Sequence, residues 1–323
     1  MANKKISLAR IKQDQAEAEK TETQIFSELI SKTISKTEEV FGRLDAYSFI
    51  SEIDKGEFTY YRSFYGEALY RIDKKIQNGK LQPQNLADFP EIIRFPDYII
   101  NAALFIGSFD PFQMTHIASA LHYLASAHAK ASIVFVVPEG HMNSNKPKKS
   151  DYKYRYELLS MQLKGIFEPF IVPLDIGENA DTIEIVKRFI GLFPGARVEV
   201  CHLLGSDSLD ILSRMLPEDL RIWNKEAQKM GSNFIYDAYI IERDGYASQK
   251  SQLEAVYGAG AQIHVDTGSI GTPSSSDFRE KQAFSIVFPT SSVINHVEVL
   301  FRYNLNKPWS VCGLADNPNG YLR

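Results

Sequence analysis

The sequence is poor in cysteine and has no long apolar runs. Its 323 residues include two cysteines, Cys201 and Cys312, which lie far apart and outside any CxxC pattern. This argues against a disulfide scaffold or a cysteine-rich zinc site and fits a reducing compartment. No run is long enough to span a bilayer, and the first residues lack the apolar core of a signal peptide. We therefore expect a soluble, cytoplasmic protein.

The chain also lacks a strong excess of positive or negative charge, and several common catalytic motifs are absent. The net charge of -4 gives no general reason to expect nucleic acid or an anionic membrane as a partner. The histidines form no HExxH, there is no GxSxG, and the phosphate loop GxxxxGK[ST] is absent. We expect no zinc site, no hydrolase with a nucleophile elbow, and neither nucleic acid nor a membrane as a partner, while a homo-oligomer stays possible.

Two regions differ in pattern along the chain. Residues 1–97 favour helices, with an apolar stripe of Ile25, Leu29, Ile30 and Ile34 and an aromatic-rich segment after it. We interpret this region as a packing or dimerisation element, with a partner-binding arm as the alternative. From residue 98 onward, apolar strands alternate with helical segments, which predicts an α/β fold with βαβ units and a mostly parallel sheet.

A short motif follows the first strand of that sheet. In "GSFDPFQMTHI", Gly107 ends the apolar run, Pro111 stiffens the turn, and Thr115 is a candidate N-cap for a helix that starts near His116. The N–H groups at a helix start attract anions, and a histidine adds a donor. A loop glycine and a capped helix with an ordinary histidine explain these residues about as well. The segments "PEGH", "GSDS" and "RDGY" also fall at strand ends, where ligands of such sheets bind.

The same motif resembles the first signature of the nucleotidyltransferase superfamily, GxFDPxHxGH. Gly107, Phe109 and His116 match, as does the Asp110–Pro111 pair, whereas Gln113 and Thr115 depart from it. "PSSSDFRE" resembles the second signature, ISSTxIR, in the expected order. It supplies Ser274, Ser275, Ser276 and Arg279.

Three further segments are similar to the pyridine mononucleotide adenylyltransferases within this superfamily. They are "LLGSDSL" with Gly205 and Asp207, the later Trp223, and "IIERDGYAS" with Arg243. The stretch before Arg155 holds two candidate lysines, Lys146 and Lys148, between which spacing does not choose. The likeness covers residues 98–305 and implies a Rossmann-like doubly wound parallel sheet of the nucleotidyltransferase type. Residues 1–97, the helical extension, and the tail 306–323 lie outside it.

This resemblance implies adenylyl transfer from ATP to nicotinamide or nicotinate mononucleotide, with Mg²⁺ held through the ATP phosphates and no metal ligand from the protein. The implied catalytic residues are His116, Arg279 and Lys146. The implied ATP contacts are Gly107, Ser108, Phe109, Gln113, His116, Gly205, Asp207, Ser274, Ser275, Ser276 and Arg279. The implied substrate contacts are Phe109, Asp110, Lys148, Arg155, Trp223 and Arg243.

Other functions stay open at this point. The chain is also compatible with a CTP- or pantetheine-phosphate-using transferase of the superfamily. Gln113, where the family usually has histidine, leaves room for a nucleotide-binding regulator with weakened catalysis. A class I aminoacyl-tRNA synthetase relative lacks support, because no KMSKS motif follows. The preference for amide or acid, the role of residues 1–97 and homo-oligomer formation are not decided by the sequence.

Overall fold

A computed structural model gives the arrangement of the chain. It describes residues 8–44, 52–82, 99–140, 150–168, 170–242, 248–267, 270 and 287–295. In the first two helices the side chains are described from residues 24 and 55 onward.

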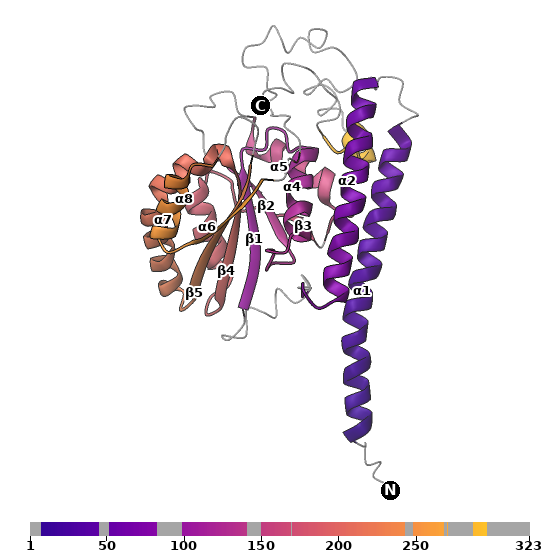
Figure 1. Ribbon diagram of the computed structural model, residues 1–323, viewed down its shortest axis with the longest axis horizontal. Coiled ribbons are helices and arrows are strands. Elements are labelled where there is room, and N and C mark those ends of the chain that lie inside the picture. The colour runs from indigo at the N-terminus through magenta and orange to yellow at the C-terminus, as the bar shows by residue number, and fades with distance from the viewer. Residues whose placement is uncertain are drawn as a thin grey trace.

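The centre of the molecule is a six-stranded sheet in the order β3-β2-β1-β4-β5-β6. Every neighbouring pair is parallel, as Figure 1 shows. The strands are β1 (Ile99–Gly107), β2 (Val134–Pro138), β3 (Ile171–Pro173), β4 (Arg197–Gly205), β5 (Asn233–Ile241) and β6 (Gln262–Asp266). This is the strand order of the Rossmann fold. The predicted doubly wound parallel sheet is therefore confirmed by the topology itself.

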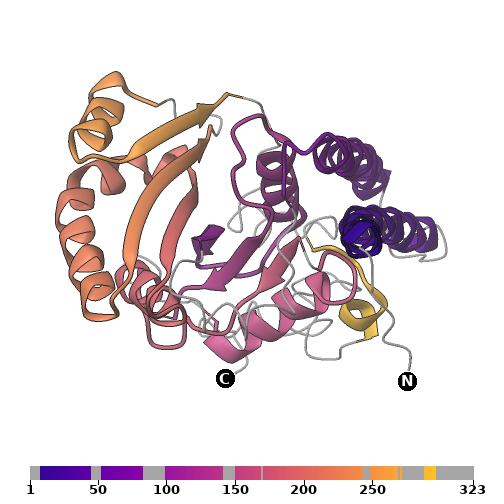
Figure 2. The ribbon, with the colours of Figure 1, turned by 90° about the horizontal axis from the view of Figure 1, so that it is seen from below.

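Helices cover both faces of the sheet, because every parallel crossover has to pass over one face. Side chains alternate along β1, so that Ala103 and Phe105 belong to one apolar core and Leu104 and Ile106 to the other. Figure 2 shows the two layers of helices on either side of the strands. The first face carries α4 (Met114–Ala125) and α5 (Tyr152–Leu163). The second carries α6 (Thr182–Gly191), α7 (Leu209–Lys229) and α8 (Lys250–Gly258).

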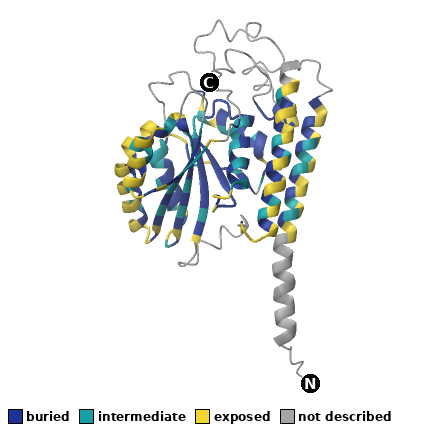
Figure 3. Cartoon of the chain, viewed as in Figure 1, coloured by how far each residue is buried: buried dark blue, intermediate teal, exposed yellow. Residues whose placement is uncertain are grey.

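The predicted helical extension is present as two long helices, α1 (Leu8–Arg43) and α2 (Glu52–Gln77), which pack against each other. One prediction within it is wrong, since Ile25 is 47% exposed while Ile30 is buried. Figure 3 shows the buried stripe along both helices. Along α1 it includes Phe26, Ile30, Thr33, Thr37, Val40 and Phe41, and it continues to Leu44 just after the helix. The spacing alternates between four and three residues, which keeps one side facing α2 and turns Ile25 outward.

The extension shares its core with the α4 side of the sheet. Phe26 packs on Phe170 with ring centroids 6.2 Å apart. Phe41 packs on Phe288 at 5.5 Å, just before the short helix α10 (Ser291–Asn295). The two N-terminal helices are therefore packed as part of the α/β body. No helix in the described part of the chain is long and apolar enough to cross a membrane.

Candidate functional site

The carboxyl ends of β1 and β4 form the switch point of the sheet. These strands are parallel neighbours with Phe105 opposite Leu203, and each ends two residues later, at Gly107 and Gly205. The helix after β1 lies on one face and the helix after β4 lies on the other. A crevice at such a point is the ligand-binding position of open α/β sheets. The fold thus brings together two segments that the sequence marked separately.

The loop from β1 to α4 packs on an aromatic floor. A Cβ atom at Gly107 would lie 3.0 Å from the ring of Phe109, so glycine lets this ring close over the end of the strand. Phe109 has a φ of 42°, and the Asp110–Pro111 peptide bond is cis. The Phe109 ring packs edge-on against Phe105 and Phe112, at centroid distances of 5.3 and 5.2 Å. The loop is therefore packed against apolar rings at the end of β1.

His116 occupies the first turn of α4. Its Nδ1 accepts a hydrogen bond from the backbone N–H of Gln113 at 2.9 Å. In the neutral ring this assigns the proton to Nε2, which becomes the N–H donor. The ring stacks on Phe112 at 5.3 Å and meets the edge of Phe109 at 5.0 Å. A third ring, Phe105, lies edge-on at 5.7 Å. The Gln113 hydrogen bond and these aromatic contacts therefore orient His116.

The N-cap of α4 is Gln113, and the prediction that Thr115 would cap this helix is wrong. The helix starts two residues earlier than that prediction requires, at Met114. Thr115 instead donates its hydroxyl hydrogen bond to Oε1 of Gln113 at 3.0 Å. Gln113 is 1% exposed. Its described contacts organise the turn that holds His116, and a direct contact with ATP stays a prediction.

Arg155 lies beneath this loop and is 1% exposed. Its Nε donates to the carbonyl of Ser150 at 2.8 Å, and its Nη2 donates to the carbonyl of Glu139 at 2.9 Å. Nη1 donates to the carbonyl of Ser108. Asp110 adds a fourth link, because its carboxylate accepts from the N–H of Ser150 at 2.8 Å. Arg155 thereby joins both flanks of segment 141–149 to the β1–α4 loop. This is a positioning role, and its contact with substrate stays a prediction.

Gly205 and Asp207 follow β4 at the other side of the switch point. Asp207 lies in the one-turn helix η3 (Ser206–Ser208) and is exposed. Its predicted contact with ATP is untested, but it lies at the carboxyl edge, as the sequence predicted. The remaining predicted site residues lie outside the described part of the chain. They are Lys146, Lys148, Arg243, Ser274, Ser275, Ser276 and Arg279.

Trp223 lies in the core between α7 and the sheet. It is 1% exposed, its indole N–H donates to the carbonyl of Ile183 at 3.1 Å, and its ring stacks on Tyr236 at 5.2 Å. The packing of this tryptophan is complete without a ligand. We therefore leave Trp223 out of the proposed substrate contacts.

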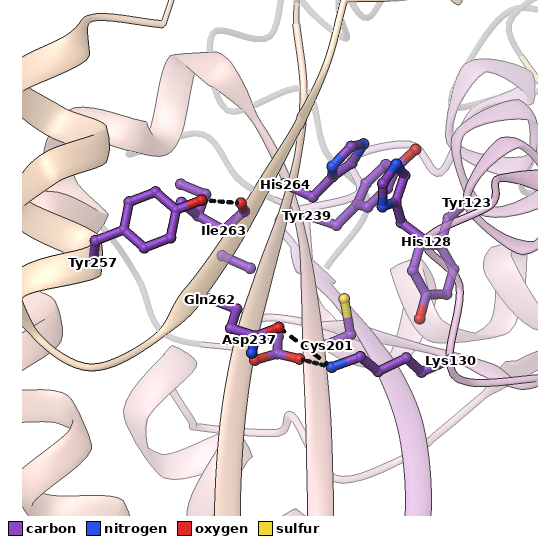
Figure 4. A pocket seen from close by; sticks show the side chains of 11 residues that line it. Tyr123, His128, Lys130, Cys201, Asp237, Tyr239, Tyr257, Gln262, Ile263 and His264 are labelled. Atoms are coloured by element: carbon purple, nitrogen blue, oxygen red, sulfur yellow. Dashed lines mark hydrogen bonds and ion pairs between the residues drawn. The ribbon is translucent and has the colours of Figure 1, made fainter.

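A second polar region was not singled out by sequence reasoning. It is a pocket of about 340 Å³ on the α4 side of β4, β5 and β6 (Figure 4). His128 stacks on His264 with centroids 3.5 Å apart, and Lys130 pairs with Asp237 at 2.8 Å. Burial raises the pKa of the Cys201 thiol to about 12, so this thiol is a poor nucleophile at neutral pH. These residues come from loops and mid-strand positions, which only the tertiary structure brings together.

Comparison with known proteins gives structural matches only. No protein-family model and no curated protein sequence matches the chain. Two solved structures of Plasmodium falciparum nicotinic acid mononucleotide adenylyltransferase are similar to it. The complex with NaAD is 20% identical, with 57% of this chain and 84% of that chain covered and a TM-score of 0.42. The complex with APC is 19% identical, with 64% and 97% covered and a TM-score of 0.43. Because both TM-scores lie below 0.5, we argue fold and function from the strand order and the site residues.

Proposed function

We propose that this protein is a nucleotidyltransferase that transfers the adenylyl group of ATP to nicotinate or nicotinamide mononucleotide and releases pyrophosphate. One observation carries the proposal. His116 stands in the first turn of α4, at the switch point, with Nδ1 accepting from the N–H of Gln113, which puts the N–H of the neutral ring on Nε2. An imidazole N–H beside the N–H groups of a helix start is suited to polyphosphate oxygens.

The proposed chemistry needs alignment and charge stabilisation more than a base. The 5′-phosphate of the mononucleotide is already ionised near neutral pH and attacks the α-phosphorus of ATP. Its oxygen forms the new P–O bond while the bond to pyrophosphate breaks. His116 stabilises the negative charge that develops on the phosphate oxygens. Arg279 and Lys146, from the family signatures, are proposed to stabilise the pyrophosphate as it leaves.

The choice of acceptor rests on the family resemblance of Gly205, Asp207 and Arg243. Mg²⁺ is proposed to arrive with ATP, coordinated by its phosphates. The residues described in the structure include no group of three or more His, Cys, Asp or Glu side chains that could hold a metal ion.

A pyrophosphate-release assay tests this proposal. The purified full chain is incubated with ATP and Mg²⁺ and with one of several acceptors. These are nicotinate mononucleotide, nicotinamide mononucleotide and phosphopantetheine. A parallel set replaces ATP with CTP. We expect pyrophosphate and the dinucleotide with a pyridine mononucleotide and ATP. Pyrophosphate release only with phosphopantetheine would overturn the assignment of the acceptor. Release only with CTP as the nucleotide would overturn the assignment of ATP as the donor. Binding of ATP without turnover on any acceptor would overturn the enzymatic role.

A further inference from the structure

Helix α2 contacts α4 at both ends. The Tyr65 hydroxyl donates to the carbonyl of Met114, the first residue of α4, at 2.8 Å. At the other end, the ammonium of Lys75 donates to the carbonyls of Leu124 at 2.8 Å and Ser126 at 2.6 Å. Ten residues separate the two donors, and a similar number separates their acceptors. The two helices therefore run side by side in the same direction and in one register.

The interface between these two contacts is apolar. Leu69 and Ile72 of α2 belong to the same buried cluster as Ile117 and Leu121 of α4. Apolar packing alone is non-directional and leaves a helix free to slide or rotate by small amounts. The buried hydrogen bond of Tyr65 and the half-buried ones of Lys75 add directional constraints at each end.

Lys75 satisfies a particular need of α4. The last carbonyl groups of a helix have no partner within it and carry the negative end of the helix dipole. A lysine ammonium both donates to such carbonyls and complements their charge. Burial lowers the pKa of Lys75 to about 8, which is a cost that an apolar residue at this position would avoid. Burying part of a lysine therefore costs more free energy than burying an apolar side chain. Its hydrogen bonds to the last carbonyls of α4 explain why a lysine is suited to this position.

The helix fixed in this way begins with His116 in its first turn. At a rise of 1.5 Å per residue, the 12 residues of α4 span about 18 Å. A shift of the helix moves the imidazole by the same amount, and a misplacement of about 1 Å can lower a rate by about 100-fold. We propose that the N-terminal helical hairpin is a positioning element of the active site, in which Tyr65 and Lys75 hold α4 so that His116 meets the ATP phosphates. This inference rests on the proposed function.

The test uses Lys75→Met, with Lys74→Met as the matched control. Lys74 is the neighbouring lysine, exposed near the end of α2, and bonds only Gln77 among the described side chains. Tyr65→Phe is the second variant, because it keeps the packed ring and removes only the hydroxyl. Lys75→Arg keeps a cation at the helix end. Each full-length variant is measured for kcat, for KM of ATP, and for ATP affinity by calorimetry without acceptor. The imidazole ¹H–¹⁵N signals of His116 are recorded by NMR.

We expect Lys75→Met to lower kcat or ATP affinity by about 10-fold. Its His116 signals should shift, whereas Lys74→Met should match the wild type in every readout. Lys75→Arg should recover part of the loss, and Tyr65→Phe should shift the same His116 signals. Wild-type kcat, ATP affinity and His116 signals in both Lys75→Met and Tyr65→Phe would overturn the positioning role. If the wild type transfers no adenylyl group, the proposed function fails, while ATP affinity and the His116 signals still decide the positioning role.

Discussion

The buried guanidinium of Arg155 donates a hydrogen bond to the carbonyl oxygen of Ser108, 47 residues away in the sequence. The same side chain bonds the carbonyls of Glu139 and Ser150. One residue thus joins the loop after β1, the residue that follows β2 and the segment just before α5. A planar group with five donors can do this, whereas a lysine cannot reach three carbonyls with the same geometry.

Arg155→Lys should therefore destabilise the protein and impair the site together. A lysine can serve one of the three carbonyls, and each of the other two costs about 1–3 kcal/mol, so we expect a total of about 2–6 kcal/mol. Turnover should fall by about 10-fold or more, because the loop beside His116 shifts. Urea unfolding and the pyrophosphate assay measure these effects. Arg221→Lys is the control, since Arg221 is exposed and pairs with Glu218. Wild-type stability and turnover in Arg155→Lys would contradict the positioning role.

His116→Ala should lower turnover by about 100-fold or more, as expected for the loss of a main charge-stabilising donor. His116→Gln should lose less, because its amide can place an N–H near the position of Nε2. His128→Ala serves as the control, because His128 is exposed and stacks on His264 away from the switch point. Single-turnover measurements with saturating ATP separate chemistry from binding. Near-normal turnover in His116→Ala would remove this residue from the proposed mechanism.

Gln113→Ala tests whether residue 113 organises the turn or binds ATP. The variant loses the acceptor for the Thr115 hydroxyl and the N-cap side chain. We expect a loss of about 1 kcal/mol in unfolding free energy and a much smaller decrease in turnover than in His116→Ala. Unfolding curves and turnover are measured on the same samples. A turnover as low as that of His116→Ala, with unchanged stability, would make Gln113 a direct phosphate ligand.

Trp223→Phe tests the assignment of this residue to the core. The change leaves the carbonyl of Ile183 without its indole donor, which should lower the unfolding free energy by about 1–3 kcal/mol. The KM for the mononucleotide should stay unchanged, because the ring packs on Tyr236. A tenfold rise in that KM with an unchanged unfolding free energy would show that Trp223 contacts the substrate and would contradict its assignment to the core.

Acid should destabilise the fold through His202. This side chain is fully buried, its Nδ1 lies 2.9 Å from the hydroxyl oxygen of Tyr236, and burial lowers its pKa from 6.5 to about 4. Between pH 6.5 and about 4 the unfolded chain binds a proton at His202 and the folded protein does not. The free energy of unfolding therefore decreases as the pH falls toward 4. The loss from this one group is about 3 kcal/mol.

The measurement has to separate His202 from Asp219, whose pKa is raised to about 6, mainly by burial. Between about pH 4 and pH 6 the folded state holds a proton on Asp219 that the unfolded state releases, so this group stabilises the fold as the pH falls, in the opposite direction to His202. Comparing wild type with His202→Gln at each pH cancels the Asp219 contribution. We expect the stability difference between them to shrink by about 3 kcal/mol from pH 7 to pH 4. A difference that does not change with pH would contradict this assignment.

Local pattern in the sequence was sufficient for the strands and for the two segments at the switch point. The apolar runs ending at Gly107 and Gly205 became β1 and β4, because buried parallel strands are apolar on both faces. The 21-residue helix α7 was not recognised, as Pro217 interrupts the usual helical signal. The cap of α4 was placed two residues too late, because Gln113 is a weaker N-cap type than the nearby Thr115.

The sequence by itself determined that Gly107 and Gly205 end two apolar strands, since an apolar run and the glycine that ends it are local features of the chain. Only the tertiary structure decided what Arg155, Trp223 and Lys75 do. Each donates to a backbone carbonyl at least 16 residues away in the chain, apart from the shorter Arg155 bond to Ser150. A carbonyl that lacks a partner is a product of folding and leaves no mark in the sequence. The roles of these three donors therefore follow from where the chain places its unsatisfied carbonyl groups.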